Sequence, residues 1–262
     1  MHRNFIVAVL VFLGAGACVP FLHGQDAPRP IKALLVLGGC CHDYATQKKI
    51  LAEGLAARAN VDVTVAYDDD KGTKKLNPVY QNPDWAKGFD VIIHDECTAD
   101  VNGKEIVDRI LQPHRDGLPA VVLHCGMHSY RVPKSDEWFK FTGLSTRNHG
   151  AQAPIEITFN PGSPITKSMS AWTTINEELY NEEQLWKTAT ALAKGKQFKN
   201  NYVLAWTNLY NDKTKVFATT LGHNNATVQD ARYLDLVANG LLWATGHLGE
   251  DGRPATGYGP KK

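Results

Sequence analysis

The sequence lacks an excess of charge of either sign, and this argues against several classes of partner. Its 28 Lys and Arg residues are matched by 27 Asp and Glu, which leaves a net charge of +1. Such a chain has no electrostatic reason to bind nucleic acid or an acidic membrane surface, and we expect neither as a partner. Internal repeats and linker-like segments are also lacking, so the 262 residues favour one globular domain.

Short-range metal motifs are missing as well. The chain contains no His-Glu-x-x-His and no Cys-x-x-Cys, so any metal site would be assembled from distant segments. Of its five cysteines, Cys18 lies near the N-terminus, and the others are Cys40, Cys41, Cys97 and Cys125. Their spacing is not that of a small disulfide scaffold. We expect buried free thiols, with one disulfide among these four as the alternative.

Long apolar runs are absent except at the N-terminus. Residues 5–22 are apolar, follow a weakly positive start and contain a stretch of small residues at 14–17. This layout is typical of a secretory signal, so we predict a signal peptide over residues 1–25. The mature protein is then exported, periplasmic or secreted, with no membrane span. A retained anchor helix and a lipid anchor on Cys18 are the alternatives.

Three short apolar runs indicate an α/β fold. Residues 31–37, 90–93 and 119–123 are rich in Val, Ile, Leu and Ala, which is typical of parallel strands buried on both faces. Helical patterns over 44–58 and 104–114 lie between them. This βαβ order predicts a single three-layer domain with a mostly parallel, doubly wound sheet.

The second half of the chain is less regular. Strands are expected at 154–160, 202–207 and 215–221, helices at 137–143 and 229–246, a lid or peripheral helix at 181–201, and a disordered Gly- and Pro-rich tail at 249–262. The folded domain is therefore expected to span residues 26–248.

Each of the three apolar runs leads into reactive side chains. The first is followed by Gly38-Gly39-Cys40-Cys41-His42-Asp43, the second by His94, and the third by His124-Cys125-Gly126-Met127-His128. In parallel sheets, ligands bind beyond the carboxyl ends of the strands. We therefore expect these side chains to share one crevice.

The turn after the third run is similar to a nucleophile elbow, where a strand turns sharply into a helix and exposes one side chain. In class I glutamine amidotransferases a cysteine occupies this position, in a Gly-Ile-Cys-x-Gly type of motif. Here Gly126 matches the glycine, His124 takes the position of the nucleophile, and Cys125 comes one residue late. A hydrolase or amidase that uses Cys125 is a minor alternative.

Eight of the ten histidines follow the predicted signal peptide. His114 and His247 end helices and are expected at the surface, whereas His128 is expected to pack or cap. The other five lie at strand ends or in loops, and their convergence would give a metal or acid–base site: His42, His94, His124, His149 and His223. Any one of them alone is more often a hydrogen-bonded structural residue.

Carboxylates and aromatic rings complete the candidate site. Of Glu177 and Glu178, one carboxylate is expected to turn inward and the other to face solvent. Asp43 either caps a helix or enters the site. Tyr180 and Trp206 offer flat apolar faces on which sugars could stack, with core packing as their alternative role.

Several segments form a family pattern when taken in order: Gly38-Gly39 with His42-Asp43, the strand ending in His124, His149, Glu177-Glu178-Leu179-Tyr180, Trp206-Thr207, Thr219-Thr220-Leu221-Gly222-His223 and Gly240-Leu241-Leu242-Trp243-Ala244. With these segments the sequence resembles the ThuA-like (trehalose utilisation) family of the class I glutamine amidotransferase-like superfamily, over about residues 31–246. The resemblance implies a flavodoxin-like sheet without the glutaminase triad, and a role in carbohydrate metabolism on oxidised (keto) disaccharides or glycosides. The site residues that it carries over are His42, His124, His149, Glu178 and His223.

Together these inferences predict an exported enzyme that acts on a small-molecule carbohydrate by moving a proton next to a carbonyl. The catalytic candidates are His124, His149, Glu178 and His223; the substrate-binding candidates are His42, Asp43, Tyr180 and Trp206; and His42, His124 and His223 are candidate ligands for a divalent metal such as zinc. A non-catalytic sugar-binding module is the main alternative. The oligomeric state is left open, including a homo-oligomer.

Overall fold

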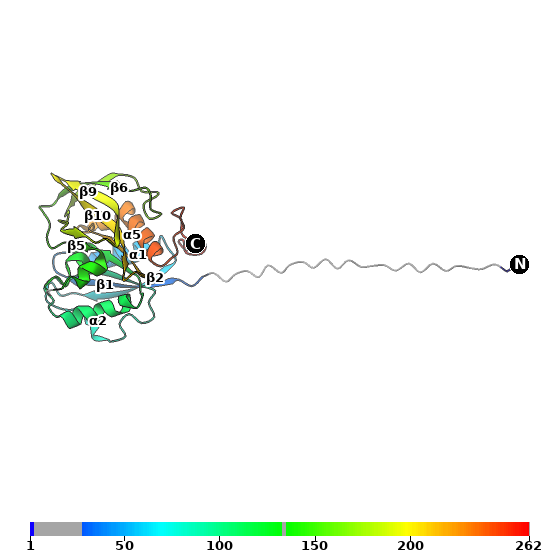
Figure 1. The fold of residues 1–262 in the computed structure, drawn as a ribbon, viewed down its shortest axis with the longest axis horizontal. Helices are drawn as coiled ribbons and strands as arrows, with labels where there is room; N and C mark the ends of the chain where they lie inside the picture. Colours follow the sequence, from blue (N-terminus) through cyan, green and yellow to red (C-terminus); the bar gives the residue numbers. More distant parts are fainter. Residues whose placement is uncertain (3–27, 133–134, 262) are drawn as a thin grey trace.

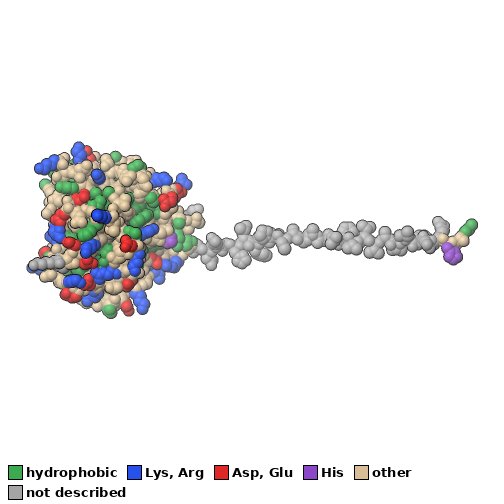
Figure 2. Space-filling model, in the orientation of Figure 1, with side chains coloured by type: hydrophobic (Ala, Val, Ile, Leu, Met, Phe, Trp, Pro, Cys, Tyr) green, Lys and Arg blue, Asp and Glu red, His purple; other side chains and the backbone are tan. Residues whose placement is uncertain are grey.

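The computed structural model describes residues 1–2, 28–132 and 135–261. Most of the predicted signal peptide, residues 1–25, therefore lies outside the described residues. Within the described part, no helix has both the length and the apolar character that crossing a membrane would require. Acidic and basic side chains are interspersed on the face shown in Figure 2, in keeping with the balanced charge of the sequence.

A nine-stranded sheet forms the centre of the protein, in the order β2-β1-β3-β4-β11-β10-β9-β6-β7. The half from β2 to β11 is parallel, and the strands from β10 to β7 continue it antiparallel. The parallel strands are β1 (Ile31–Gly39), β2 (Val61–Asp68), β3 (Val91–Cys97), β4 (Ala120–Leu123) and β11 (Thr214–Thr219). The antiparallel strands are β6 (Ala153–Phe159), β7 (Trp172–Glu177), β9 (Ala189–Gln197) and β10 (Asn200–Tyr210), and a separate pair joins β5 (Leu144–Ser145) to β8 (Gln184–Leu185).

Helices cover both faces of the sheet and give the predicted three layers (Figure 1). One face carries α1 (Tyr44–Ala56), α4 (Asn225–Val228) and α5 (Ala231–Ala244), and the other carries α2 (Lys104–Arg115) and α3 (Glu137–Thr142). Two 3-10 turns, η1 (Pro78–Gln81) and η2 (His124–His128), follow β2 and β4. The predicted α/β class is confirmed, as are the helices predicted at 44–58, 104–114, 137–143 and 229–246.

The segment 181–201 forms strands instead of the expected lid or peripheral helix. In β9, small residues point inward and lysines outward: Ala193 and Gly195 are buried, whereas Lys194 and Lys196 are exposed. A Cβ on Gly195 would lie 2.7 Å from the side chain of Leu204, so the close packing at this position requires glycine. Because the buried positions hold Ala and Gly rather than large apolar residues, they differ little in hydrophobicity from the exposed positions. The apolar periodicity of the sequence therefore does not predict this strand.

The expected disordered tail is instead folded against the domain up to residue 261. The Asn60 amide donates to the Tyr258 carbonyl (3.0 Å), and the Tyr258 ring stacks on His247 with 3.6 Å between ring centroids. Leu248 and Pro254 form an isolated β-bridge. The low hydrophobicity of this tail does not reveal these few specific contacts. Because of them, the folded domain extends past the predicted boundary at residue 248.

A buried polar cluster lies between the sheet and the α2–α3 layer, and it holds two histidines predicted elsewhere. His94 was expected at the candidate site and His114 at the surface, but both are fully buried. Their Nε2 atoms are 3.1 Å apart, and His94 Nδ1 lies 3.0 Å from the carboxylate of Glu96. The hydroxyls of Tyr80 and Tyr130 donate to the same carboxylate oxygen, at 2.6 and 3.0 Å.

Burial of His114 makes the stability of the fold sensitive to acid. Burial and the neighbouring His94 lower the pKa of His114 to about 3, so between that pH and 6.5 the unfolded chain binds more protons than the folded one. Above pH 6.5 the neutral His114 ring does not lower the free energy of unfolding. Each pH unit below 6.5 lowers that free energy by about 1.4 kcal/mol, until the pKa of the folded state is reached. We expect urea midpoints to fall between pH 7.5 and 5.0 in the wild type and to fall less in His114→Asn. Equal pH slopes in the two proteins would contradict this account.

Candidate functional site

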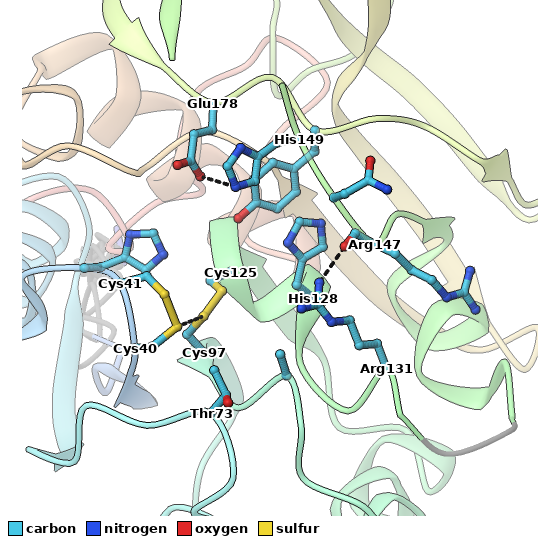
Figure 3. Close-up of a pocket in the computed structure, with 14 residues that line it drawn as sticks. Cys40, Cys41, Thr73, Cys97, Cys125, His128, Arg131, Arg147, His149 and Glu178 are labelled. Atoms are coloured by element: carbon cyan, nitrogen blue, oxygen red, sulfur yellow. Dashed lines mark hydrogen bonds and ion pairs between the residues drawn. A yellow bond between two sulfur atoms is a disulfide. The ribbon is translucent and has the colours of Figure 1, made fainter. Parts of the chain in front are cut away.

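A pocket of about 290 Å³ opens where the parallel strands end. It lies beyond the carboxyl ends of β1, β3 and β4, the edge at which such sheets bind ligands. Its lining includes His42, His128, His149, Glu178 and Tyr180. Figure 3 shows the carboxylate of Glu178 directed toward the ring of His149. Six of the strand-end side chains thus meet in one crevice, namely those of Cys40, Cys41, His42, Cys97, Cys125 and His128. Asp43, His94 and His124 do not line it.

His124 occupies a sharp turn at the end of β4. Its φ angle of 39° is in the left-handed region, which non-glycine residues rarely adopt and which is often found at functional turns. Gly126 is needed in the same turn, because a Cβ there would lie 2.7 Å from the carbonyl oxygen of His94. His124 Nδ1 donates to the Thr220 carbonyl at 2.7 Å, so Nε2 of the neutral ring is left as an acceptor toward the site.

His42 lies in the loop after β1, and the two positions at the end of that strand, Gly38 and Gly39, require glycine. Gly38 and Gly39 have positive φ angles, and a Cβ on either would lie 2.3 Å from a backbone oxygen of β2 or β3. The His42 ring lies 4.6 Å from His124 and 4.8 Å from His223, measured between ring centroids. Burial and these two imidazoles lower the pKa of His42 to about 2, and its Nδ1 is a buried nitrogen without a hydrogen-bond partner among the described residues.

Glu178 connects three histidines. One carboxylate oxygen lies 3.1 Å from His223 Nδ1, and the other lies 3.5 Å from His124 Nε2 and 3.4 Å from His149 Nε2. Although burial alone would raise the pKa of Glu178, its contacts with the rings of His124 and His223 outweigh burial and hold that pKa far below its usual range. The same contact with Glu178 raises the pKa of His223. The carboxylate is therefore ionised and positioned to receive or return protons through the imidazoles.

Glu177 is buried too, although one of the two carboxylates was expected to face solvent. Its oxygens accept from the backbone amides of His223 at 3.1 Å and Asn224 at 3.0 Å. Gln47 supports the same loop from α1, since its side-chain amide donates to the carbonyl of His223 at 3.1 Å. Glu177 thus fixes the loop that carries His223, while Glu178 contacts the His223 ring.

Two residues of the site were not found from the sequence. His128 was expected to pack or cap, but its ring lines the pocket and stacks on Tyr180 with 3.9 Å between centroids. The side-chain amide of Gln152 lies 2.8 Å from His223 Nε2 and 3.2 Å from Glu178. The position of His128, close after His124 at a strand end, was a usable signal, whereas nothing in the sequence marks Gln152.

The remaining substrate-binding candidates have different positions. Tyr180 lines the pocket and its hydroxyl donates to His124 Nε2 at 3.2 Å. Asp43 instead caps α1, where it accepts from the Thr46 amide at 3.2 Å. Trp206 is fully buried in the core, with Nε1 donating to the Thr142 carbonyl at 2.7 Å, and it does not line the pocket. The expectation of a sugar-stacking role for Trp206 is therefore corrected.

The cysteines form two disulfides, where free thiols were expected. One bond joins the adjacent Cys40 and Cys41, and the other joins Cys97 to Cys125. Sequence spacing gave no indication of a bond between neighbours or of the approach of η2 to the end of β3. Because its sulfur is bonded to Cys97, Cys125 has no thiol to act as a nucleophile, and the Cys125 hydrolase alternative loses its chemical basis.

Comparison with known proteins agrees with this architecture. The solved structure of a ThuA-like protein from Parabacteroides merdae matches with a TM-score of 0.67 and 18% identity, covering 89% of this chain and 98% of that one. A ThuA-like protein from Bacteroides uniformis matches with a TM-score of 0.63 and 15% identity, covering 85% and 94%. A β-galactosidase from Bacillus circulans sp. alkalophilus gives 0.52 and 13%, covering 86% of this chain and 32% of that one. At these identities the likeness shows the fold alone.

Family membership rests on the sequence. A search of curated proteins found no match. The family model described as ThuA, trehalose utilisation, matches residues 32–244, which is most of the chain and includes every histidine of the site. The chain therefore belongs to the ThuA family, which is linked to carbohydrate utilisation, and it has the expected flavodoxin-like fold.

Proposed function

We propose that this protein is an enzyme that acts on an oxidised (keto) disaccharide or glycoside. The observation that carries this proposal is the contact of one ionised carboxylate, Glu178, with three imidazoles at the edge of the pocket. A cluster of coupled acid and base groups in a cleft, with strongly shifted pKa values, is typical of a catalytic site. Membership of a family linked to sugar utilisation supports the substrate class.

The arrangement suits proton transfer at a carbon next to a carbonyl. The neutral His124 ring presents its Nε2 lone pair at the site, and after taking a proton the same nitrogen would face the Glu178 carboxylate 3.5 Å away. Glu178 thus stabilises the imidazolium that forms. Once His124 Nε2 carries the proton, the hydroxyl of Tyr180 would no longer donate to it and would be free to donate to the developing oxyanion.

The chain also offers a set of donors that suits a divalent cation such as zinc. His42, His124 and His223 each place a potential ligand atom within 4.8 Å of the others. His42 has a buried ring nitrogen without a partner, and the hydrogen bond of His124 to Thr220 fixes the tautomer that directs a lone pair inward. A cation bound there would polarise the carbonyl of the substrate, and it would occupy the Nε2 lone pair of His124. The metal site is therefore an alternative to His124 as the base.

Metal analysis of the purified protein tests this donor set. We expect near-stoichiometric divalent metal in the wild type and its loss in both His124→Ala and His223→Ala, because each variant removes one of three ligands. His247→Ala, a histidine packed on Tyr258 outside the pocket, is the matched control and should keep the metal. No metal in a folded wild type after incubation with zinc would exclude the metal site and leave an acid–base site.

Turnover of a 3-keto-glucoside tests the enzymatic role itself. We expect turnover by the wild type and none by His124→Ala or His223→Ala. Saturable sugar binding without turnover that survives both substitutions would contradict the enzymatic role and favour a sugar-binding module. The two disulfides support the proposed export, since such bonds persist in oxidising compartments.

A further inference from the structure

Sulfur atoms form one continuous wall of the pocket. Cys40, Cys41, Cys97 and Cys125 all line it, and we call these four residues the sulfur wall. The two disulfides touch, with 3.5 Å between the Sγ atoms of Cys40 and Cys97. Figure 3 shows both disulfides on one side of the pocket, with His128 and Arg131 on the opposite side.

The sulfur wall is apolar and fixed before any ligand arrives. A disulfide sulfur donates no hydrogen bond, accepts only weakly and is highly polarisable, so it behaves as an apolar contact surface. Cys97 and Cys125 are almost fully buried, Cys40 is half-buried, and Cys41 is exposed. Because both bonds lock their side chains, a ligand that packs on them does not have to immobilise free rotamers.

The opposite side of the pocket is polar. His128, Arg131, Asn148 and His149 line it, and these side chains supply hydrogen-bond donors and acceptors. The one aromatic face expected there is covered, because the Tyr180 ring is stacked on His128 with 3.9 Å between centroids. The apolar face that a sugar site ordinarily takes from an aromatic ring must therefore come from elsewhere in the lining.

We propose that the sulfur wall is the surface on which the C–H face of a pyranose ring packs, with the hydroxyls of the sugar directed at the polar side. An apolar wall facing a polar one matches a ring that is apolar on its face and polar around its rim. The inference rests on the proposed function and adds to it the orientation of the sugar and the ring form of the substrate. A ring bound in this way would lie between Cys41 and the side of the pocket formed by His128, close to Glu178.

Contact between sugar and sulfur can be measured directly on the wild type. In protein labelled with [β-13C]cysteine, methyl β-glucoside should give intermolecular NOEs from its ring C–H protons to the Hβ protons of Cys41. Sorbitol has similar hydroxyls but no ring face, and it should give none. Binding of the glucoside without any NOE to a cysteine would overturn the inference.

Removal of the exposed disulfide provides the second measurement. Cys40→Ser/Cys41→Ser keeps the side-chain size but replaces apolar sulfur with hydroxyls, and we expect about a tenfold rise in Kd for the glucoside and in KM for the keto-sugar. The substitutions could also raise Kd and KM by displacing the neighbouring His42. The NOE experiment excludes this explanation, because it is done on the wild type. Turnover by wild type with an unchanged KM in the variant would overturn the sulfur wall while the proposed function stands. Neither binding nor turnover by wild type would overturn both.

Discussion

Glu178→Gln is expected to lower the turnover of a keto-sugar by about 10²–10⁴-fold, the usual contribution of positioned acid–base groups. Glutamine has the same shape but no charge, so it can contact the imidazoles without stabilising a protonated one. The three contacts of the carboxylate, at 3.1 to 3.5 Å from ring nitrogens of His124, His149 and His223, would all lose the negative charge of Glu178.

The loss should appear mainly in kcat. Substrate contacts on the sulfur wall and on the polar side of the pocket remain, so KM should change much less than kcat. Steady-state kinetics with far-UV circular dichroism as a check on folding would measure both. Glu156→Gln is the matched control, because Glu156 lies on β6 in an exposed pair with Lys196 far from the lining of the pocket. Near-wild-type kcat in Glu178→Gln would remove Glu178 from the mechanism.

The parallel half of the sheet could be predicted from the sequence because burial on both faces leaves a clear signal. In β1, Leu34 and Val36 pack toward α2, whereas Leu35 and Leu37 pack toward α1 and α5. A strand with this environment must be apolar at every position. The position of the site follows from the same pattern, because the ends of adjacent parallel strands share one edge.

Which strand-end histidines reach the site could not be predicted, because successive side chains of a strand point to opposite faces. Along β3, Ile92 packs in the α2–α3 core and Ile93 in the core on the other face. His94 and Glu96 follow Ile92 in this alternation, and they are buried beneath α2 and α3 rather than at the pocket. The sequence shows that alternation but not which layer covers which face, so His94 was misplaced.

Contacts between distant loops were equally hidden. The bond between Cys97 and Cys125 depends on how closely η2 approaches the end of β3. Trp206 ends a run of four buried residues in β10, at positions 203–206, and an apolar strand position does not say whether its side chain lines a core or a pocket. The contacts of Gln152 depend on a loop between β5 and β6 that has no local pattern. Tertiary packing decides all three.

Glu96→Gln is expected to lower the free energy of unfolding by about 3–5 kcal/mol, the usual cost of removing one partner from a buried ion pair. The ion pair follows from the hydrogen bonds of the cluster. His114 Nδ1 must donate to the Leu118 carbonyl, 2.7 Å away. With a lowered pKa the His114 ring is neutral, so its Nε2 accepts from His94 Nε2, 3.1 Å away.

His94 then needs a second proton. Its Nδ1 lies 3.0 Å from a Glu96 oxygen that already accepts from the hydroxyls of Tyr80 and Tyr130. If His94 Nδ1 carried no proton, its lone pair would face a lone pair of the Glu96 carboxylate oxygen. A protonated Nδ1 instead donates a third hydrogen bond to that oxygen. His94 is therefore an imidazolium paired with ionised Glu96, and His94 favours the low pKa of that carboxyl even though burial opposes it. Glutamine would leave this imidazolium without its counter-charge.

Urea unfolding at pH 7.5 would measure the difference between Glu96→Gln and wild type. Glu156→Gln makes the same chemical change in an ion pair whose side chains are 60% and 66% exposed, and it should leave the urea midpoint unchanged within error. The contrast isolates burial as the cause, since both variants remove one carboxylate charge from one pair. Equal midpoints for the two variants would mean that His94 is neutral in the folded protein. The proton between His94 and Glu96 would then lie on the Glu96 carboxyl, with His94 Nδ1 as its acceptor, while His94 Nε2 would still donate to His114.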